Sequence, residues 1–134
     1  MVDLLAYSGK WYEVAKKNAY FEVQCQRATA EYTAVKNGLE VLNTCYLKDG
    51  KTTSIEGFAS PTNVANIFNL RFNTGQTGKY QILFTDYQNF SIVGDISTDY
   101  VSVLSRKPTV SEAEKSLLNE ILLLLGFTNV KWVS

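Results

Sequence analysis

The chain has 134 residues, thirteen Lys and Arg against thirteen Asp and Glu, and 13% aromatic residues. This length predicts one domain, over residues 1–134, with a single buried core. The balanced charge without a Lys or Arg cluster argues against a nucleic-acid partner, and no stretch reaches the roughly 20 apolar residues that a membrane span needs.

The first residues, MVDLLAYSGKW, lack the charged, apolar and cleavage regions of a signal peptide. We therefore expect one of two locations. The chain is either cytosolic as written, or the mature domain of a secreted or periplasmic protein whose signal peptide has been removed. We expect a monomer or a weak dimer.

Most of the chain alternates apolar and polar residues with a period of two, which is typical of β-strands. About eight such segments are rich in β-branched and aromatic residues: 11–16, 26–35, 39–48, 51–59, 65–73, 78–85, 90–97 and 100–105. Short turns such as KNG at 36–38 predict antiparallel hairpins between consecutive strands. The long irregular connection at 17–25 is predicted to form a flap over one end of the strands.

The period changes at 108–126, which predicts one helix after the strands. Ser111 with Glu114, or Thr109 with Glu112, would form its capping box, and Gly126 would end it. Its apolar positions form a broad stripe that is predicted to pack on the outer face of the sheet. These positions are Val110, Ala113, Leu117, Leu118, Ile121, Leu122, Leu124 and Leu125.

Sequential antiparallel strands followed by one helix indicate an all-β fold: an eight-stranded up-and-down β-barrel with a C-terminal α-helix on its outer face. A barrel of this size can enclose one small ligand. Alternation turns one face of each strand inward, and the residues predicted there are Ala28, Ala30, Tyr32, Phe68, Leu70, Phe72, Tyr80, Ile82 and Phe84. These apolar walls imply either an apolar ligand or a solid core.

Three motifs, GKWYEVAK at 9–16, TDYQNFSIVGD at 85–95 and YVSVLSRKP at 100–108, resemble the three signature regions of the lipocalins, in order and at the family's spacing. The segments VLNTCY, SIEGFASP and PTVSEAEK resemble its bacterial-lipocalin and apolipoprotein D branch. The resemblance implies a barrel that carries a small hydrophobic molecule in a cup.

The resemblance also implies structural roles for the signature residues, which are Gly9, Trp11, Thr85, Asp86, Tyr87 and Arg106. Trp11 would lie at the closed end of the barrel with the Arg106 guanidinium across its ring. Gly9 would let the chain pass closely beneath this pair. We expect Asp86 to bind backbone amides in its own turn rather than to act in catalysis.

For the ligand, Tyr32 and Asn43 resemble pocket positions of the apolipoprotein D branch and add hydrogen-bonding groups to an apolar wall. Ser102 stands where the bacterial branch usually has tryptophan, so we expect a wider and more polar cavity. The predicted ligand has one polar end: a fatty acid, a lysophospholipid, a retinoid or a sterol-like molecule. We expect no cofactor.

The absence of histidine removes the usual zinc site and the Ser–His and Cys–His pairs, so we predict a binding protein rather than an enzyme. The alternative is a lipid isomerase that uses a cavity cysteine. Cys25 and Cys45 are predicted to be free thiols, because the hairpin at 36–38 offsets them by several residues. The intracellular fatty-acid binders fit less well, because residues 17–25 are too few for their helical pair.

Overall fold

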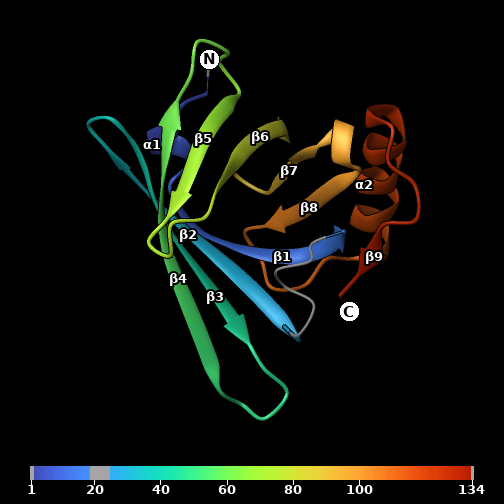
Figure 1. The fold of residues 1–134 in the computed structure, drawn as a ribbon. Helices are drawn as coiled ribbons and strands as arrows, with labels where there is room; N and C mark the ends of the chain where they lie inside the picture. Colours follow the sequence, from blue (N-terminus) through green and yellow to red (C-terminus); the bar gives the residue numbers. More distant parts are fainter. Residues whose placement is uncertain (1, 19–24, 134) are drawn as a thin grey trace.

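A computed structural model describes residues 2–18 and 25–133 (Figure 1). The helices are α1 (Leu4–Tyr7), the 3-10 turn η2 (Ile96–Thr98) and α2 (Glu112–Leu125). The strands are β1 (Gly9–Lys17), β2 (Arg27–Val35), β3 (Gly38–Tyr46), β4 (Thr52–Pro61), β5 (Ile67–Phe72), β6 (Thr77–Thr85), β7 (Phe90–Asp95), β8 (Tyr100–Ser105) and β9 (Lys131–Trp132). The flap predicted over 17–25 falls mainly on residues 19–24, outside the described residues.

The strands form one closed antiparallel barrel. Each strand from β2 to β7 pairs with the next in sequence, and β1 closes the ring by pairing with β8 and with β2. The predicted eight-stranded up-and-down barrel is therefore confirmed. Three elements were not predicted: the short helix α1, the turn η2 and strand β9, which adds to the edge of β1 at Ala15 and Lys16.

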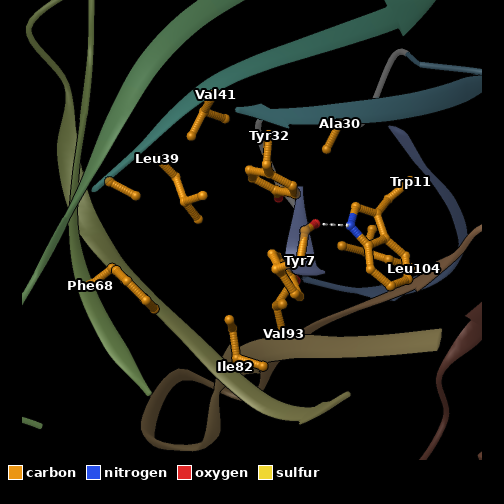
Figure 2. Close-up of a cluster of buried hydrophobic side chains, with 11 residues drawn as sticks. Tyr7, Trp11, Ala30, Tyr32, Leu39, Val41, Phe68, Ile82, Val93 and Leu104 are labelled. Carbon is orange, nitrogen blue, oxygen red and sulfur yellow. Dashed lines mark hydrogen bonds between the residues drawn. The ribbon is translucent and has the colours of Figure 1, made fainter. Parts of the chain in front are cut away.

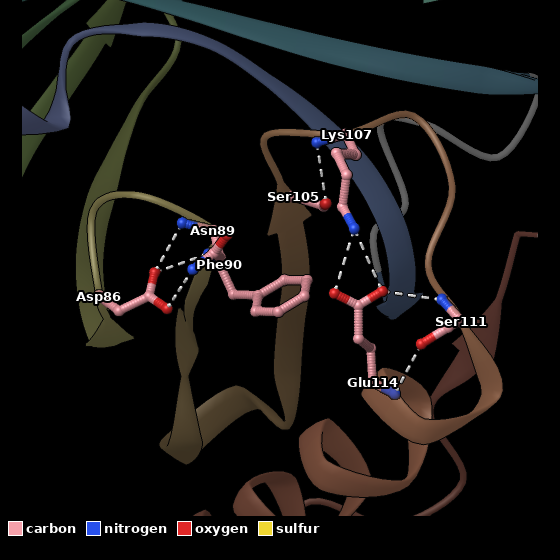
Figure 3. A network of polar contacts seen from close by, with 7 residues as sticks. All are labelled: Asp86, Asn89, Phe90, Ser105, Lys107, Ser111 and Glu114. Carbon is pink, nitrogen blue, oxygen red and sulfur yellow. Dashed lines mark hydrogen bonds and ion pairs between the residues drawn. The ribbon is translucent and has the colours of Figure 1, made fainter.

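Helix α2 packs on the outside of the barrel, as predicted. Ser111 and Glu114 form a capping box in which each side chain accepts a hydrogen bond from the other residue's backbone N–H, and Lys107 pairs with the same glutamate (Figure 3). Gly126 ends the helix in the left-handed region. Leu118 and Leu122 pack against an outer cluster formed by Val14, Ala15, Phe90, Ile92, Val101, Val103 and Phe127.

The apolar stripe of α2 is narrower than the sequence predicts. Leu117 is 55% exposed and Leu124 is 88% exposed, so neither contacts the sheet as expected. A single helix on a curved barrel wall contacts it along one narrow line, which Leu118 and Leu122 occupy. Leu117 and Leu124 therefore face away from the barrel, whereas Val110, Ile121 and Leu125 are partly buried beside that line.

The inner core lies toward one end of the barrel (Figure 2). At this end are α1, the β2–β3, β4–β5 and β6–β7 connections, and the residues just after β8. Tyr7 of α1 and Trp11 of β1 are fully buried there, and the Trp11 indole N–H donates to the Tyr7 carbonyl at 3.0 Å (Figure 2). The short helix thus closes the base of the barrel.

Arg106 joins α1, β1 and the β6–β7 turn at this base. Its guanidinium carbon lies 3.7 Å from the centroid of the Trp11 ring. Its N–H groups donate to the carbonyls of four residues, Ala6, Tyr7, Lys10 and Tyr87, at 3.0–3.3 Å. Gly9, at φ +110°, passes so close that an added Cβ would lie 3.0 Å from an Arg106 nitrogen. Glycine avoids both the backbone strain and the steric conflict.

The turn between β6 and β7 is held by Asp86 and Thr85. The Asp86 carboxylate accepts from the backbone N–H groups of Asn89 and Phe90 at 2.8 Å (Figure 3). Partial burial acts to raise the pKa of Asp86, but the hydrogen bonds from these N–H groups have a larger, opposite effect. The pKa of Asp86 therefore lies below its ordinary value. Thr85 donates to the Phe90 carbonyl, and the Tyr87 carbonyl accepts from Arg106. All of these contacts are internal to the fold.

The prediction of free thiols is wrong, because Cys25 and Cys45 form a disulfide with a Cα–Cα distance of 5.3 Å. The β2–β3 ladder does place Ala28, not Cys25, opposite Cys45. However, the ladder ends at Arg27, and Cys25 lies beyond it. Because the chain there is no longer held in the extended register, it can bring Cys25 back beside Cys45.

We expect Trp11→Ala to destabilise the protein by about 3–5 kcal/mol, because it leaves a cavity under Arg106. Urea unfolding followed by circular dichroism measures the loss. Trp132→Ala is the matched control, since its indole is only half-buried. Equal losses of unfolding free energy in the two variants would show that Trp11 at the base contributes no more to stability than a half-buried tryptophan does.

The disulfide should stabilise the fold by about 2–4 kcal/mol, because it closes a loop in the unfolded chain. The two cysteines are 20 residues apart in sequence. We expect the urea midpoint to fall in dithiothreitol, and to be insensitive to dithiothreitol in a Cys25→Ser, Cys45→Ser double variant. An intact mass equal to that of the fully reduced chain in oxidised preparations would contradict the pairing.

Candidate functional site

A cavity of about 810 Å³ occupies the other half of the barrel. Strands β1 to β8 all contribute to its wall, and its rim includes Leu47, Gln76 and Thr98 from three connections between strands. These connections lie at the end opposite α1, so the cavity is a cup whose floor is the inner core. Its volume lies in the range of small-molecule sites.

Six of the eight predicted ligand-contacting residues line this cavity: Tyr32, Asn43, Leu70, Phe72, Tyr80 and Ser102. The other two, Phe68 and Ile82, do not. They are 2% and 4% exposed and belong to the inner core at the base (Figure 2). Alternation gives the face of the strand correctly, but it does not tell how deep a residue lies, and both residues lie below the floor of the cup.

Phe84, also predicted to face inward, packs instead against the outer cluster beneath α2. The cause is an irregularity in the β6–β7 ladder. Ile82 pairs with Val93, whereas Phe84 pairs with Ile92, so the register shifts by one residue between them. A bulge of this kind reverses the faces of the residues that follow it.

Three tyrosine hydroxyls form a buried chain at the floor of the cup. The Tyr80 hydroxyl donates to Tyr32 at 2.9 Å and shares a 2.8 Å hydrogen bond with Tyr7. Tyr7 also bonds the buried Ser91 hydroxyl at 2.7 Å. Tyr32 and Tyr80 line the cavity, so this chain connects the polar atoms of the base to the ligand space.

Burial governs the ionisation of two of these tyrosines. Desolvation raises the pKa of Tyr7 to about 12, against the smaller opposing effects of Ser91, Tyr80 and Arg106. Burial also raises the pKa of Tyr80 well above its ordinary value, and the neighbouring Tyr32 and Tyr7 add to this. Both hydroxyls therefore remain protonated at neutral pH and can donate hydrogen bonds.

Glu13 of β1 is a cavity residue that the sequence did not lead us to expect. It is 7% exposed, lines the cup, and accepts a 2.5 Å hydrogen bond from the Ser102 hydroxyl. A signal existed, because Glu13 follows Trp11 by two residues and alternation places both on the inward face. A charged residue on the inward face of a strand indicates a polar position in the cavity wall.

Both cysteines line the cup on the side of its rim. Because they are joined to each other, neither is free to act as a nucleophile. The isomerase alternative therefore lacks the thiol on which it depends. Within residues 2–18 and 25–133 no group of three or more His, Cys, Asp or Glu side chains is placed to hold a metal ion. Among the helices of these residues, none has the length and apolarity to cross a membrane.

The closed barrel, the external helix and the open cup define a lipocalin-type protein. The family model of the lipocalin-like domain matches residues 2–133, and the chain belongs to this family. Mouse (Mus musculus) apolipoprotein D is 33% identical over 131 residues, which cover 90% of this chain and 69% of that protein. The outer membrane lipoprotein Blc of Vibrio cholerae is 35% identical over 127 residues, covering 90% and 72%.

A solved structure of the cockroach allergen Per a 4 has the same fold. It superposes with a TM-score of 0.77 at 22% identity, covering 99% of this chain and 88% of that one. The predicted family and its apolipoprotein D and bacterial branch are therefore confirmed.

The tyrosine chain predicts how stability depends on alkaline pH. Because the pKa of Tyr7 is raised in the folded state, Tyr7 stabilises the fold fully at pH values below its unfolded pKa near 10. This stabilisation is lost as the pH rises from there through about 12. The loss amounts to about 3 kcal/mol for a two-unit shift. Urea unfolding at several pH values between 9 and 12 should show this fall, and Tyr7→Phe should reduce it. An equally steep fall in the variant would assign the effect to other groups.

Proposed function

We propose that this protein binds a small hydrophobic ligand with one polar end and carries or stores it in the barrel cup. The observation that carries the proposal is the cavity of about 810 Å³, enclosed by a closed barrel and bordered by both apolar side chains and inward hydroxyls. Such a site suits a fatty acid, a lysophospholipid, a retinoid or a sterol-like molecule. The names of two relatives, an apolipoprotein and an outer membrane lipoprotein, associate those proteins with lipid.

In this proposal, some cup residues contact the apolar part of the ligand and others bind its polar end. Leu70 and Phe72 of β5 would contact the apolar body of the ligand, while Tyr32, Asn43 and Tyr80 would offer hydrogen bonds. Phe68 and Ile82 would support the floor rather than contact the ligand. No catalytic step is proposed, since the chain has no histidine and its two cysteines are paired.

A compartment outside the cytosol fits this function best. Disulfides persist in oxidising compartments such as the periplasm and the extracellular space, and are rare in the cytosol. The Cys25–Cys45 pair supports a secreted or periplasmic protein, the second of the two locations that the sequence left open.

Ser102→Trp tests the proposed site. The ring should fill part of the cup and weaken binding of all-trans-retinol about tenfold or more, equivalent to at least about 1.4 kcal/mol. A slim saturated chain such as 1-decanol should be affected much less, because the cup remains open at its rim. Fluorescence titration with retinol, and displacement of N-phenyl-1-naphthylamine by decanol, measure both.

Thr33→Trp is the matched control, because Thr33 is exposed on the opposite face of β2 and should leave both affinities unchanged. Absence of binding of every probe to the wild-type protein would refute the proposed function. Equal loss for retinol and decanol would indicate misfolding of the variant, which its thermal unfolding would reveal. No change for either probe would remove Ser102 from the ligand site.

A further inference from the structure

A carboxylate is an unusual group in the wall of a cavity for hydrophobic ligands. The side chain of Glu13 is 5% exposed, yet it borders the cup. Burying a charge is costly unless other groups bind it. The contacts of Glu13 therefore indicate which chemical group of a ligand would bind beside its carboxylate.

The carboxylate is only partly satisfied by the described residues. Its Oε2 atom accepts the Ser102 hydroxyl at 2.5 Å, and its Oε1 atom lies 3.9 Å from the Lys16 ammonium. The second distance fits an ion pair but exceeds hydrogen-bond length. An ionised carboxyl can accept about four hydrogen bonds, so Glu13 retains capacity for a further donor.

The bulge in β1 creates this arrangement. The β1–β8 register shifts between Glu13 and Ala15, after which Lys16 lies opposite Ser102. Glu13, Lys16 and Ser102 are thereby brought together, although Val14 and Ala15 lie between Glu13 and Lys16 in the sequence. Glu13 and Ser102 border the cup whereas Lys16 does not, so the face presented to a ligand carries the negative charge.

The other charged residues that border the cup do not offset the negative charge of Glu13. Lys79 is exposed at the start of β6, near the rim, where water screens it. Asp95 accepts from the backbone N–H and the hydroxyl of Ser97 at 3.0 and 2.6 Å, and so caps the turn η2. Among the charged residues of 2–18 and 25–133 that border the cup, Glu13 is thus the buried one.

We infer that the polar end of the ligand is a hydrogen-bond donor, an ammonium or a hydroxyl group, held by Glu13, and that the cup discriminates against carboxylates there. This inference rests on the proposed function and narrows it. A donor would complete the hydrogen bonding of the carboxylate. A ligand carboxylate would bring two like charges together in a poorly solvated space. Of the ligand classes considered, retinol-like and sterol-like alcohols fit and fatty acids do not.

The test compares chains of equal length with different heads. Decylamine, 1-decanol, decanoate and methyl decanoate would displace N-phenyl-1-naphthylamine from the wild-type protein at pH 7.4. The ammonium and the carboxylate both carry a full charge, so the ratio of their two affinities is less affected by the general cost of removing a charge from water. We expect decylamine to bind about tenfold or more tightly than decanoate, and decanol to bind more tightly than methyl decanoate, which lacks a donor.

Glu13→Gln keeps the shape and a hydrogen-bond acceptor but removes the charge. We expect it to reduce the ratio of decylamine to decanoate affinity at least fivefold and to change decanol affinity less than threefold. Glu31→Gln is the matched control, because Glu31 is exposed outside the barrel on β2 and should leave all four affinities unchanged.

The outcomes separate this inference from the proposed function. If N-phenyl-1-naphthylamine and all four chains fail to bind the wild-type protein, the proposed function fails. If they bind but decanoate matches or exceeds decylamine, or if Glu13→Gln leaves their ratio unchanged, only the head-group inference is overturned. Should Glu13→Gln fail to fold, the wild-type ratio still decides the matter.

Discussion

Closure of the sheet through β1 is the constraint on which the rest of the structure depends. This strand pairs with β2 near its start and with β8 toward its end, and it also carries β9 on its edge. A closed barrel has no free sheet edge, but its closing strand must form hydrogen bonds with two neighbouring strands at once. The bulge between Glu13 and Ala15 meets that requirement. It leaves the consecutive residues Val14 and Ala15 both in the outer cluster beneath α2, whereas Trp11 lies in the inner core.

The same closure divides the barrel into a filled half and an empty half. At the base, Trp11, Tyr7 and Arg106 combine ring packing with hydrogen bonds to carbonyls of α1 and β1. Each of the three guanidinium nitrogens of Arg106 thus finds a carbonyl acceptor, which offsets its desolvation. The base can therefore provide stability while the cup remains open, since buried area in one half compensates for the core that the other half lacks. Ligand specificity can vary in the cup without loss of the fold.

Much of this fold was predictable because alternation and turn residues are local signals. All eight barrel strands were predicted with ends within two residues of those observed, and the Ser111 capping box was one of two predicted choices. The errors share a cause, which is geometry that arises between elements. The bulge that turns Phe84 outward and the chain path that brings Cys25 to Cys45 depend on neighbouring strands. The exposure of Leu117 depends likewise on the curvature of the barrel.

The cavity wall was predicted in part for the same reason. Tyr32, Leu70, Phe72 and Tyr80 follow from alternation, whereas the depth that separates them from Phe68 and Ile82 depends on where the base ends. Glu13 and Ser102 lie on different strands, so their contact could not be inferred from either motif alone. Ser102 donates the hydrogen bond that Glu13 accepts, and its short side chain fills little of the cup that both residues border. A small hydroxyl residue in β8 thus leaves a carboxylate bordering the ligand space, and the head group that a ligand presents becomes a matter of charge as well as of shape.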